Sequence, residues 1–130
     1  MGQSGGGGSV AGMADVTIYH NPNCSTSVFA VKEAERLGVE VDTVLYLKTK
    51  PGRDELLGLL AKLEDPAADL VRKDGFFREQ GLDEADYRTA DAVADLLVAH
   101  PRLLQRPVLV RGDRAIIGRP KTRVEAFLLG

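Results

Sequence analysis

Residues 16–27 have the sequence VTIYHNPNCSTS. The first four are β-branched or aromatic, which favours a short buried strand. Apolar residues at helical spacing follow over residues 28–37, and Gly38 is a residue type that commonly ends helices. Cys24, the single cysteine of the chain, is therefore predicted to lie at the turn between this strand and a helix over residues 25–37.

The predicted position of Cys24 favours a reactive thiolate. The first backbone N–H groups of a helix have no partner within the helix and lie at the positive end of its dipole. Such a site binds anions and lowers the pKa of a cysteine below its free value of about 8.5. A lone cysteine is more often a small buried apolar residue, but the polar neighbours Asn23, Ser25 and Thr26 favour the reactive interpretation. His20, at the end of the strand, could donate a hydrogen bond or positive charge to the sulfur, or simply cap the strand.

Composition and charge exclude several classes of protein. A chain of 130 residues is long enough for one domain with one core. Its formal net charge of −2 offers no general attraction to nucleic acid, and no apolar run is long enough to span a membrane. One cysteine cannot form an internal disulfide, which favours a reducing cytoplasm.

The chain begins with a glycine-rich segment. Residues 1–12 are interpreted as a flexible tail or linker, and the folded domain is expected over residues 13–130. The segment has no basic stretch followed by an apolar one, so we expect no signal peptide.

The rest of the sequence predicts a mixed sheet covered by helices. A second strand is expected over residues 39–47, parallel to the first because a helix connects them. The other expected elements are helices over residues 53–63, 67–72 and 89–100, a β-hairpin over residues 108–117 and a closing helix over residues 122–129. This order is typical of a thioredoxin-like α/β domain, with a mixed four-stranded sheet, flanking helices and a helical insertion.

The spacing around Cys24 excludes three kinds of cysteine chemistry. A dithiol oxidoreductase needs Cys-x-x-Cys, and the second position is occupied by Ser27. A tyrosine-phosphatase-type loop needs an arginine where this chain has Ala30. A cysteine protease needs a histidine base, and His100, the alternative to His20, ends a predicted helix. A single-thiol nucleophile remains, whose covalent adduct must be released by an external thiol.

Three arginines have settings suited to binding an oxyanion: Arg72, Arg106 and Arg119. The last two precede Pro107 and Pro120, on either side of the predicted hairpin. Proline restricts the backbone of the residue before it, which fixes where that side chain points. A cis peptide would be most useful at Pro107. Each arginine, taken alone, could equally be an ordinary solvated residue.

Several segments together resemble the glutaredoxin-coupled, thioredoxin-fold ArsC arsenate reductases. The loop HNPNCSTS at residues 20–27 is similar to the active-site loop of that family. Three segments resemble its arginine motifs, in the family's order: LVRK at residues 70–73, QRPV at residues 105–108 and GRP at residues 118–120. Further matches are YLKT at residues 46–49 with Pro51, RDEL at residues 53–56 and HP at residues 100–101. The resemblance covers about residues 16–128.

The resemblance implies a role for each matching residue. Cys24 would attack arsenic, and His20 would help to keep it ionised. The oxyanion and the arsenic intermediate would be bound by the three arginines and by the loop residues, namely Arg72, Arg106, Arg119, Asn21, Ser25, Thr26 and Ser27. Members of the family commonly have an arginine directly after the Cys-x-x-Ser segment, where this chain has Val28, so one positive charge is missing.

The resemblance also implies the other components of the reaction. Arsenate would be the substrate, glutathione or another low-molecular-weight thiol the co-substrate, and a glutaredoxin-like protein the redox partner. No bound cofactor and no metal are expected. Two alternatives stay open. One is a transcriptional regulator of the Spx type that binds RNA polymerase, although Ser27 removes the Cys-x-x-Cys switch common in such regulators. The other is a monothiol, glutathione-dependent oxidoreductase with an organic substrate.

Overall fold

The computed structural model describes residues 14–130, in which one mixed sheet has the strand order β2-β1-β3-β4. The strands are β1 (Val16–Tyr19), β2 (Val41–Val44), β3 (Val108–Arg111) and β4 (Arg114–Ile117). β1 runs parallel to β2 and antiparallel to β3, and β3 and β4 form an antiparallel hairpin. The predicted fold class and the parallel start of the sheet are confirmed. The predicted tail over residues 1–12, and Met13, lie outside the described residues.

Helices fill the connections between the strands. The longer ones are α1 (Ser25–Leu37), α3 (Arg53–Lys62), α5 (Ala90–Ala99) and α6 (Thr122–Leu129). Shorter helical segments are α2 (Tyr46–Thr49), η1 (Ala67–Leu70), α4 (Gly75–Glu79), η2 (Glu84–Asp86) and η3 (Pro101–Leu103). The predicted helix over residues 25–37 is confirmed, and Gly38 ends it with a φ of 70°, a backbone conformation that favours glycine.

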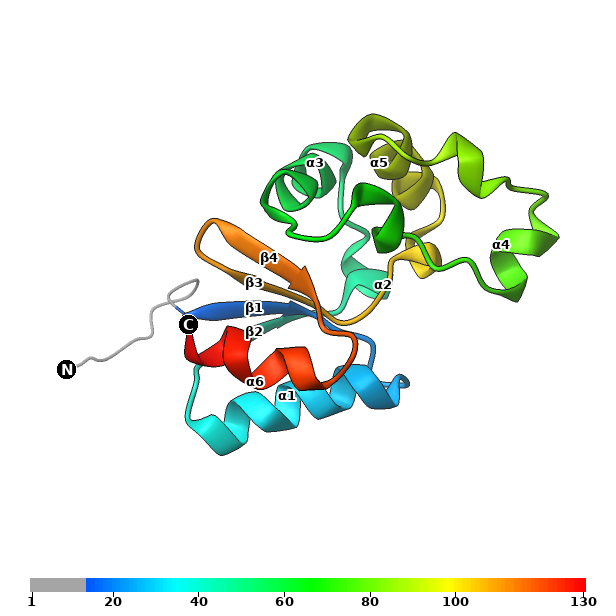
Figure 1. Ribbon diagram of the computed structural model, residues 1–130. Helices are drawn as coiled ribbons and strands as arrows, with labels where there is room; N and C mark the ends of the chain where they lie inside the picture. The colour runs from blue at the N-terminus through cyan, green and yellow to red at the C-terminus, as the bar shows by residue number, and fades with distance from the viewer. Residues whose placement is uncertain (1–13) are drawn as a thin grey trace.

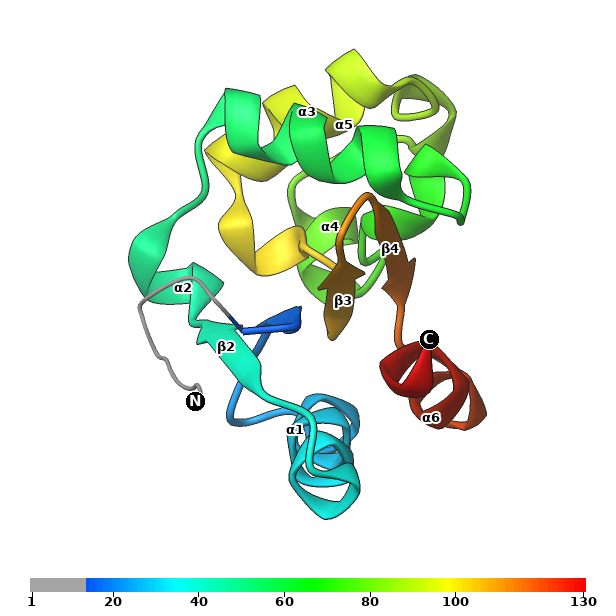
Figure 2. The ribbon, with the colours of Figure 1, turned by 90° about the vertical axis from the view of Figure 1, so that its left-hand side faces the viewer.

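The sheet separates two apolar cores because its strands alternate the side on which their side chains point. Val16, Ile18 and Leu109 belong to the core under α1 and α6. Tyr19 and Val108, their neighbours along the strands, belong to the core shared with the helices between β2 and β3. Figures 1 and 2 show α1 and α6 together on one side of the sheet, with α3 and α5 on the other. The helical insertion thus covers a face of the sheet.

Two predicted elements are shorter in the structure. The second strand ends at Val44, not at residue 47, because the chain turns into α2 at Tyr46, whose side chain is completely buried. The predicted helix over residues 67–72 is the short 3-10 helix η1, and Arg72 follows it in an extended segment. That segment pairs with the chain at the end of η3, since Arg72 N–H donates to Leu103 O at 2.7 Å and Val71 pairs with Leu104. Arg72 is therefore positioned by this pairing rather than by a helix end.

The described residues contain no helix that is both long and apolar enough to cross a membrane.

Candidate functional site

Cys24 lies in a tight turn directly before α1, as the sequence predicts. Its own N–H donates to Asn21 O at 3.0 Å, and its carbonyl accepts the first helical hydrogen bond from Val28 N at 2.9 Å. The residue is the N-cap of α1, with extended φ and ψ of −108° and 120°. Only 9% of its surface is exposed. The sulfur is therefore a partly buried group held at the N-terminus of a helix.

The surroundings of Cys24 favour its ionised form. Burial has the largest single effect and raises the pKa of the thiol. The backbone N–H groups of Ser27 and Thr26 lower it, as does the guanidinium of Arg106 through hydrogen bonding and charge. Together these influences outweigh burial, so the pKa of Cys24 lies below its ordinary value. The predicted helix-terminus effect is present, although the sulfur makes no regular capping hydrogen bond.

Ser27 organises the loop that holds the cysteine. Its side chain is completely buried, and Oγ accepts a hydrogen bond from Asn21 N–H at 3.0 Å. The same oxygen lies 2.7 Å from Nδ1 of His20. Burial lowers the pKa of His20, so the ring is neutral at neutral pH, and a neutral ring can accept the Ser27 proton at Nδ1. The structure thus brings His20 into contact with Ser27 and not into a hydrogen bond with Cys24.

Arg106 and Arg119 are brought together by the closing of the β3–β4 hairpin. Beyond the last paired strand residues, Gly118 N–H donates to Pro107 O at 2.8 Å. A side chain at position 118 would lie 2.8 Å from Pro107 Cγ, so glycine permits this close approach. The two arginines flank this contact, and Arg119 Nε donates to Arg106 O at 2.8 Å. Both Arg-Pro peptides are cis, including the one for which the sequence suggested it.

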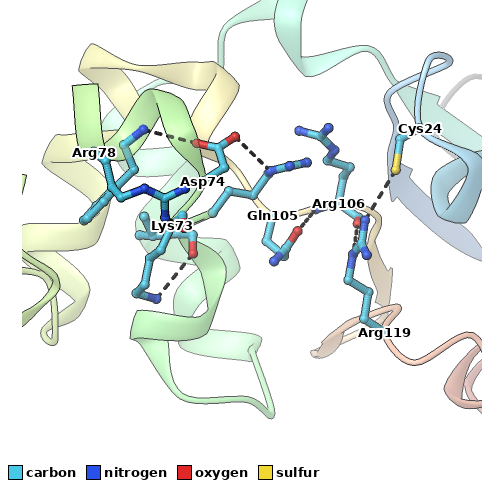
Figure 3. Close-up of polar contacts among 10 residues, drawn as sticks. Cys24, Lys73, Asp74, Arg78, Gln105, Arg106 and Arg119 are labelled. Atoms are coloured by element: carbon cyan, nitrogen blue, oxygen red, sulfur yellow. Dashed lines mark hydrogen bonds and ion pairs between the residues drawn. The ribbon is translucent and has the colours of Figure 1, made fainter. Parts of the chain in front are cut away.

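Arg119 links the hairpin to the cysteine loop. Its Nη2 donates a hydrogen bond to Cys24 Sγ at 3.4 Å, as Figure 3 shows. Arg106 lies beside the same sulfur and contributes to its low pKa. Two positive side chains from one end of the hairpin therefore converge on the sulfur of Cys24.

Arg72 approaches from the helical insertion. It shares with Arg119 the wall of a cavity of about 230 Å³, which Lys73, Asp74 and Gln105 complete. Arg72 Nε lies 3.4 Å from Asp74 Oδ2, so an aspartate partly neutralises this arginine. The structure brings Arg72 to the cavity at Arg119 and gives it no hydrogen bond to the sulfur.

The other predicted residues of the loop differ in their burial and in how they act on the sulfur. Asn21 and Ser27 are buried and shape the turn, and Thr26 acts on the sulfur through its backbone. Ser25 is exposed at the start of α1.

Sequence reasoning missed three residues at the site. Lys73 and Gln105 line the cavity with the arginines, and the side chain of Tyr46 approaches Arg106 from α2. Lys73 and Gln105 adjoin the predicted arginines in sequence, which is a signal that could have found them. Tyr46 begins the YLKT segment that resembles a family motif, but it sits in a run typical of a strand, and its spacing from Cys24 does not indicate a contact. No cluster of three or more side chains able to hold a metal ion occurs within residues 14–130.

The sequence matches the model of the ArsC family over residues 19–127. The chain belongs to the ArsC family. This ArsC-family protein is 36% identical to the "Arsenate reductase" of Neisseria meningitidis serogroup A over 118 residues, 89% of this chain and 100% of the relative. It is 39% identical to the "Arsenate reductase" of Escherichia coli strain K12 over 117 residues, 89% of this chain and 82% of the relative.

Solved structures give the same family relationship. The arsenate reductase from Vibrio cholerae superposes with a TM-score of 0.78 at 31% identity, covering 88% of this ArsC-family chain and 98% of that one. A putative arsenate reductase from Yersinia pestis gives a TM-score of 0.75 at 38% identity, covering 85% of this chain and 97% of that one. The thioredoxin-like fold predicted from the order of elements is thereby confirmed.

Proposed function

We propose that this protein is an arsenate reductase in which the Cys24 thiolate attacks arsenic and an external thiol completes the reaction. The observation that carries the proposal is the convergence of Arg106 and Arg119 on a cysteine at a helix N-terminus. A tetrahedral oxyanion needs several hydrogen-bond donors, and Arg72 supplies another from across the cavity. We propose arsenate, rather than another oxyanion, as the substrate because the similar proteins are named arsenate reductases.

The first step forms a bond between sulfur and arsenic. The Cys24 thiolate attacks As(V), and one arsenate oxygen leaves as water after it has been protonated. The arginines stabilise the charge on the remaining oxygens. The positive charge of Arg106 also favours the thiolate, the form that reacts, over the thiol.

The second step needs a thiol from another molecule. The position three residues after Cys24 is Ser27, whose hydroxyl is buried and hydrogen-bonded within the loop. We infer that glutathione or another small thiol attacks the Cys24 sulfur. A mixed disulfide forms, the electron pair of the S–As bond goes to arsenic, and arsenic leaves as As(III). A glutaredoxin-like protein then reduces the mixed disulfide. This cycle requires a reducing compartment, such as the cytoplasm.

The test is arsenite formation from arsenate by the purified protein with glutathione and glutaredoxin. We expect turnover by the wild type and none by Cys24→Ser. Arg114→Gln is the matched control, because Arg114 is exposed at the other end of the β3–β4 hairpin, where it pairs with Glu64 at 2.6 Å. Equal activity of the wild type and Cys24→Ser would end the proposal. A parallel assay with thioredoxin separates the two redox partners, and turnover with thioredoxin alone would reject only the glutaredoxin coupling.

A further inference from the structure

Tyr46 carries a buried hydroxyl that the reaction described above does not use. Its side chain has 0% exposure at the start of α2, just after β2. Tyr46 Oη and Arg106 Nε are the two buried side-chain polar atoms without a hydrogen-bond partner within residues 14–130. Leaving such an atom unpaired costs about 1–3 kcal/mol, so each case needs an explanation. Both residues are close enough to Cys24 for charge to act between them, since Arg106 lowers the pKa of Cys24 and Cys24 raises the pKa of Tyr46.

The surroundings of Tyr46 Oη connect it to the oxyanion site. Burial has the largest effect and raises the pKa of Tyr46, and negative charge on Cys24 acts in the same direction. The charge of Arg106 and the approach of the polar groups of Arg106 and Asn21 lower the pKa of Tyr46 without reversing the shift. Both side chains therefore lie near Tyr46 Oη, but neither reaches it with the geometry of a hydrogen bond. Tyr46 therefore stays protonated and neutral at physiological pH. A neutral hydroxyl can accept one hydrogen bond while it donates another.

We propose that Tyr46 is a positioning residue, whose hydroxyl accepts a hydrogen bond from Arg106 when negative charge is present at Cys24. That charge is either the thiolate or an oxyanion bound to it. The part of the inference that concerns a bound oxyanion rests on the proposed function, and the part that concerns the thiolate does not.

A hydrogen bond between Arg106 Nε and Tyr46 Oη would give both unpaired atoms a partner. Arg106 Nε has a proton without an acceptor, and Tyr46 Oη lies close enough to Arg106 for the charge of the guanidinium to affect it. Negative charge at the sulfur attracts the guanidinium of Arg106. This attraction offsets the entropy that the side chain loses when it is held in one orientation. Accepting the Nε–H then holds the guanidinium plane, while the remaining N–H groups of Arg106 point at the anion. The free-energy cost of burying each atom without a partner is therefore removed for both atoms when negative charge is present at Cys24.

The experiment is Tyr46→Phe, read out in three ways. The first is the pH profile of Cys24 alkylation by iodoacetamide, which needs no turnover. The second is protection of Cys24 from alkylation by arsenate and by sulfate. The third is thermal unfolding of the anion-free protein.

We expect Tyr46→Phe to move the inflection of the alkylation profile to higher pH, because Arg106 stabilises the thiolate less. Protection by arsenate and by sulfate should require about tenfold more anion, as expected when one hydrogen bond to a charged group is lost. The melting temperature of the anion-free protein should equal or exceed that of the wild type, because the hydroxyl that is removed has no partner there.

The other two tyrosines provide matched controls. Tyr19→Phe removes a hydroxyl that donates to Glu55 Oε2 at 2.6 Å, so it should lower the melting temperature without moving the alkylation profile. Tyr87→Phe alters a ring packed edge to face against Phe77 in the insertion, and should leave both anion protection and alkylation unchanged. In an Arg106→Lys background, which lacks the Nε donor, Tyr46→Phe should have no further effect on anion protection.

Two results would overturn the inference. One is an alkylation profile and anion protection that are both unchanged in Tyr46→Phe. Another is a fall in melting temperature as large as that of Tyr19→Phe, which would mean that the hydroxyl is already paired in the free protein. Failure of the proposed function looks different. A wild type that forms no arsenite, together with a shifted alkylation profile in Tyr46→Phe, would reject arsenate reduction and support the role of Tyr46.

Discussion

Replacing Arg119 by glutamine should slow the reaction of Cys24 with alkylating reagents. Arg119 Nη2 donates to the sulfur at 3.4 Å, on the side of Cys24 that faces the β3–β4 hairpin, and Arg106 acts on the same sulfur. Glutamine keeps much of the length of the side chain and removes the charge. Without that charge the thiolate is less stable, so the pKa of Cys24 rises and the pH profile moves to higher pH.

The size of the effect follows from the geometry. Two unit charges 3.4 Å apart interact by about 5 kcal/mol at an effective dielectric constant of about 20. Arg119 is partly exposed, so solvent screens it, and the usual worth of a hydrogen bond to a charged group, about 1.5–3 kcal/mol, is the better guide. The thiolate fraction should therefore fall by about 10- to 150-fold at pH values below both inflections.

The assay is the rate of iodoacetamide alkylation of Cys24 as a function of pH. Arg114→Gln is the matched control, because it removes the same charge from the far end of the hairpin, where Arg114 pairs with Glu64 at 2.6 Å. We expect the profile of this control to coincide with that of the wild type. An Arg119→Gln profile that also coincided with the wild type would refute the reasoning, since the guanidinium would then contribute nothing to the ionisation of Cys24.

Three further outcomes are expected. The wild-type alkylation rate should rise through an inflection below the free-thiol value of about 8.5, because the pKa of Cys24 is lowered, and an inflection at or above that value would contradict this. Ser27→Ala should lower the free energy of unfolding by about 1–3 kcal/mol in urea titrations, because a buried backbone N–H loses its acceptor, whereas Ser25→Ala should change it little. Gly118→Ala should destabilise the protein by about 1–3 kcal/mol and weaken oxyanion binding, because its Cβ would approach Pro107 Cγ to 2.8 Å; unaltered thermal unfolding would contradict the tight approach.

The sequence predicted the elements whose residues carry a strong local signal. The strand–turn–helix around Cys24 was predicted correctly because β-branched residues, a polar turn and a terminal glycine all act over short distances. Arg106 and Arg119 were recognised because each precedes a proline, and the structure places both at the cysteine. The hairpin between them was predicted from two short apolar runs separated by a turn at Gly112 and Asp113, and the structure confirms it.

Other features depend on contacts between distant residues, which local patterns do not reveal. Tyr46 appeared to continue a strand, but its ring fills the core and the chain turns into α2 there. Arg72 appeared to end a helix, but pairing with Leu103 holds it in an extended segment. His20 was expected at the sulfur, and the buried hydroxyl of Ser27 lies within its reach instead. In each case a tertiary contact overrides the local preference.

The contact between Arg119 and Cys24 also has a consequence for the order in which the protein matures. The two residues are 95 positions apart in the sequence. A ribosome therefore exposes the cysteine long before it has made either of the arginines that converge on the sulfur. During that interval the thiol lacks the positive neighbours that lower its pKa in the folded protein. Their effect on the sulfur begins only when the hairpin docks against the cysteine loop.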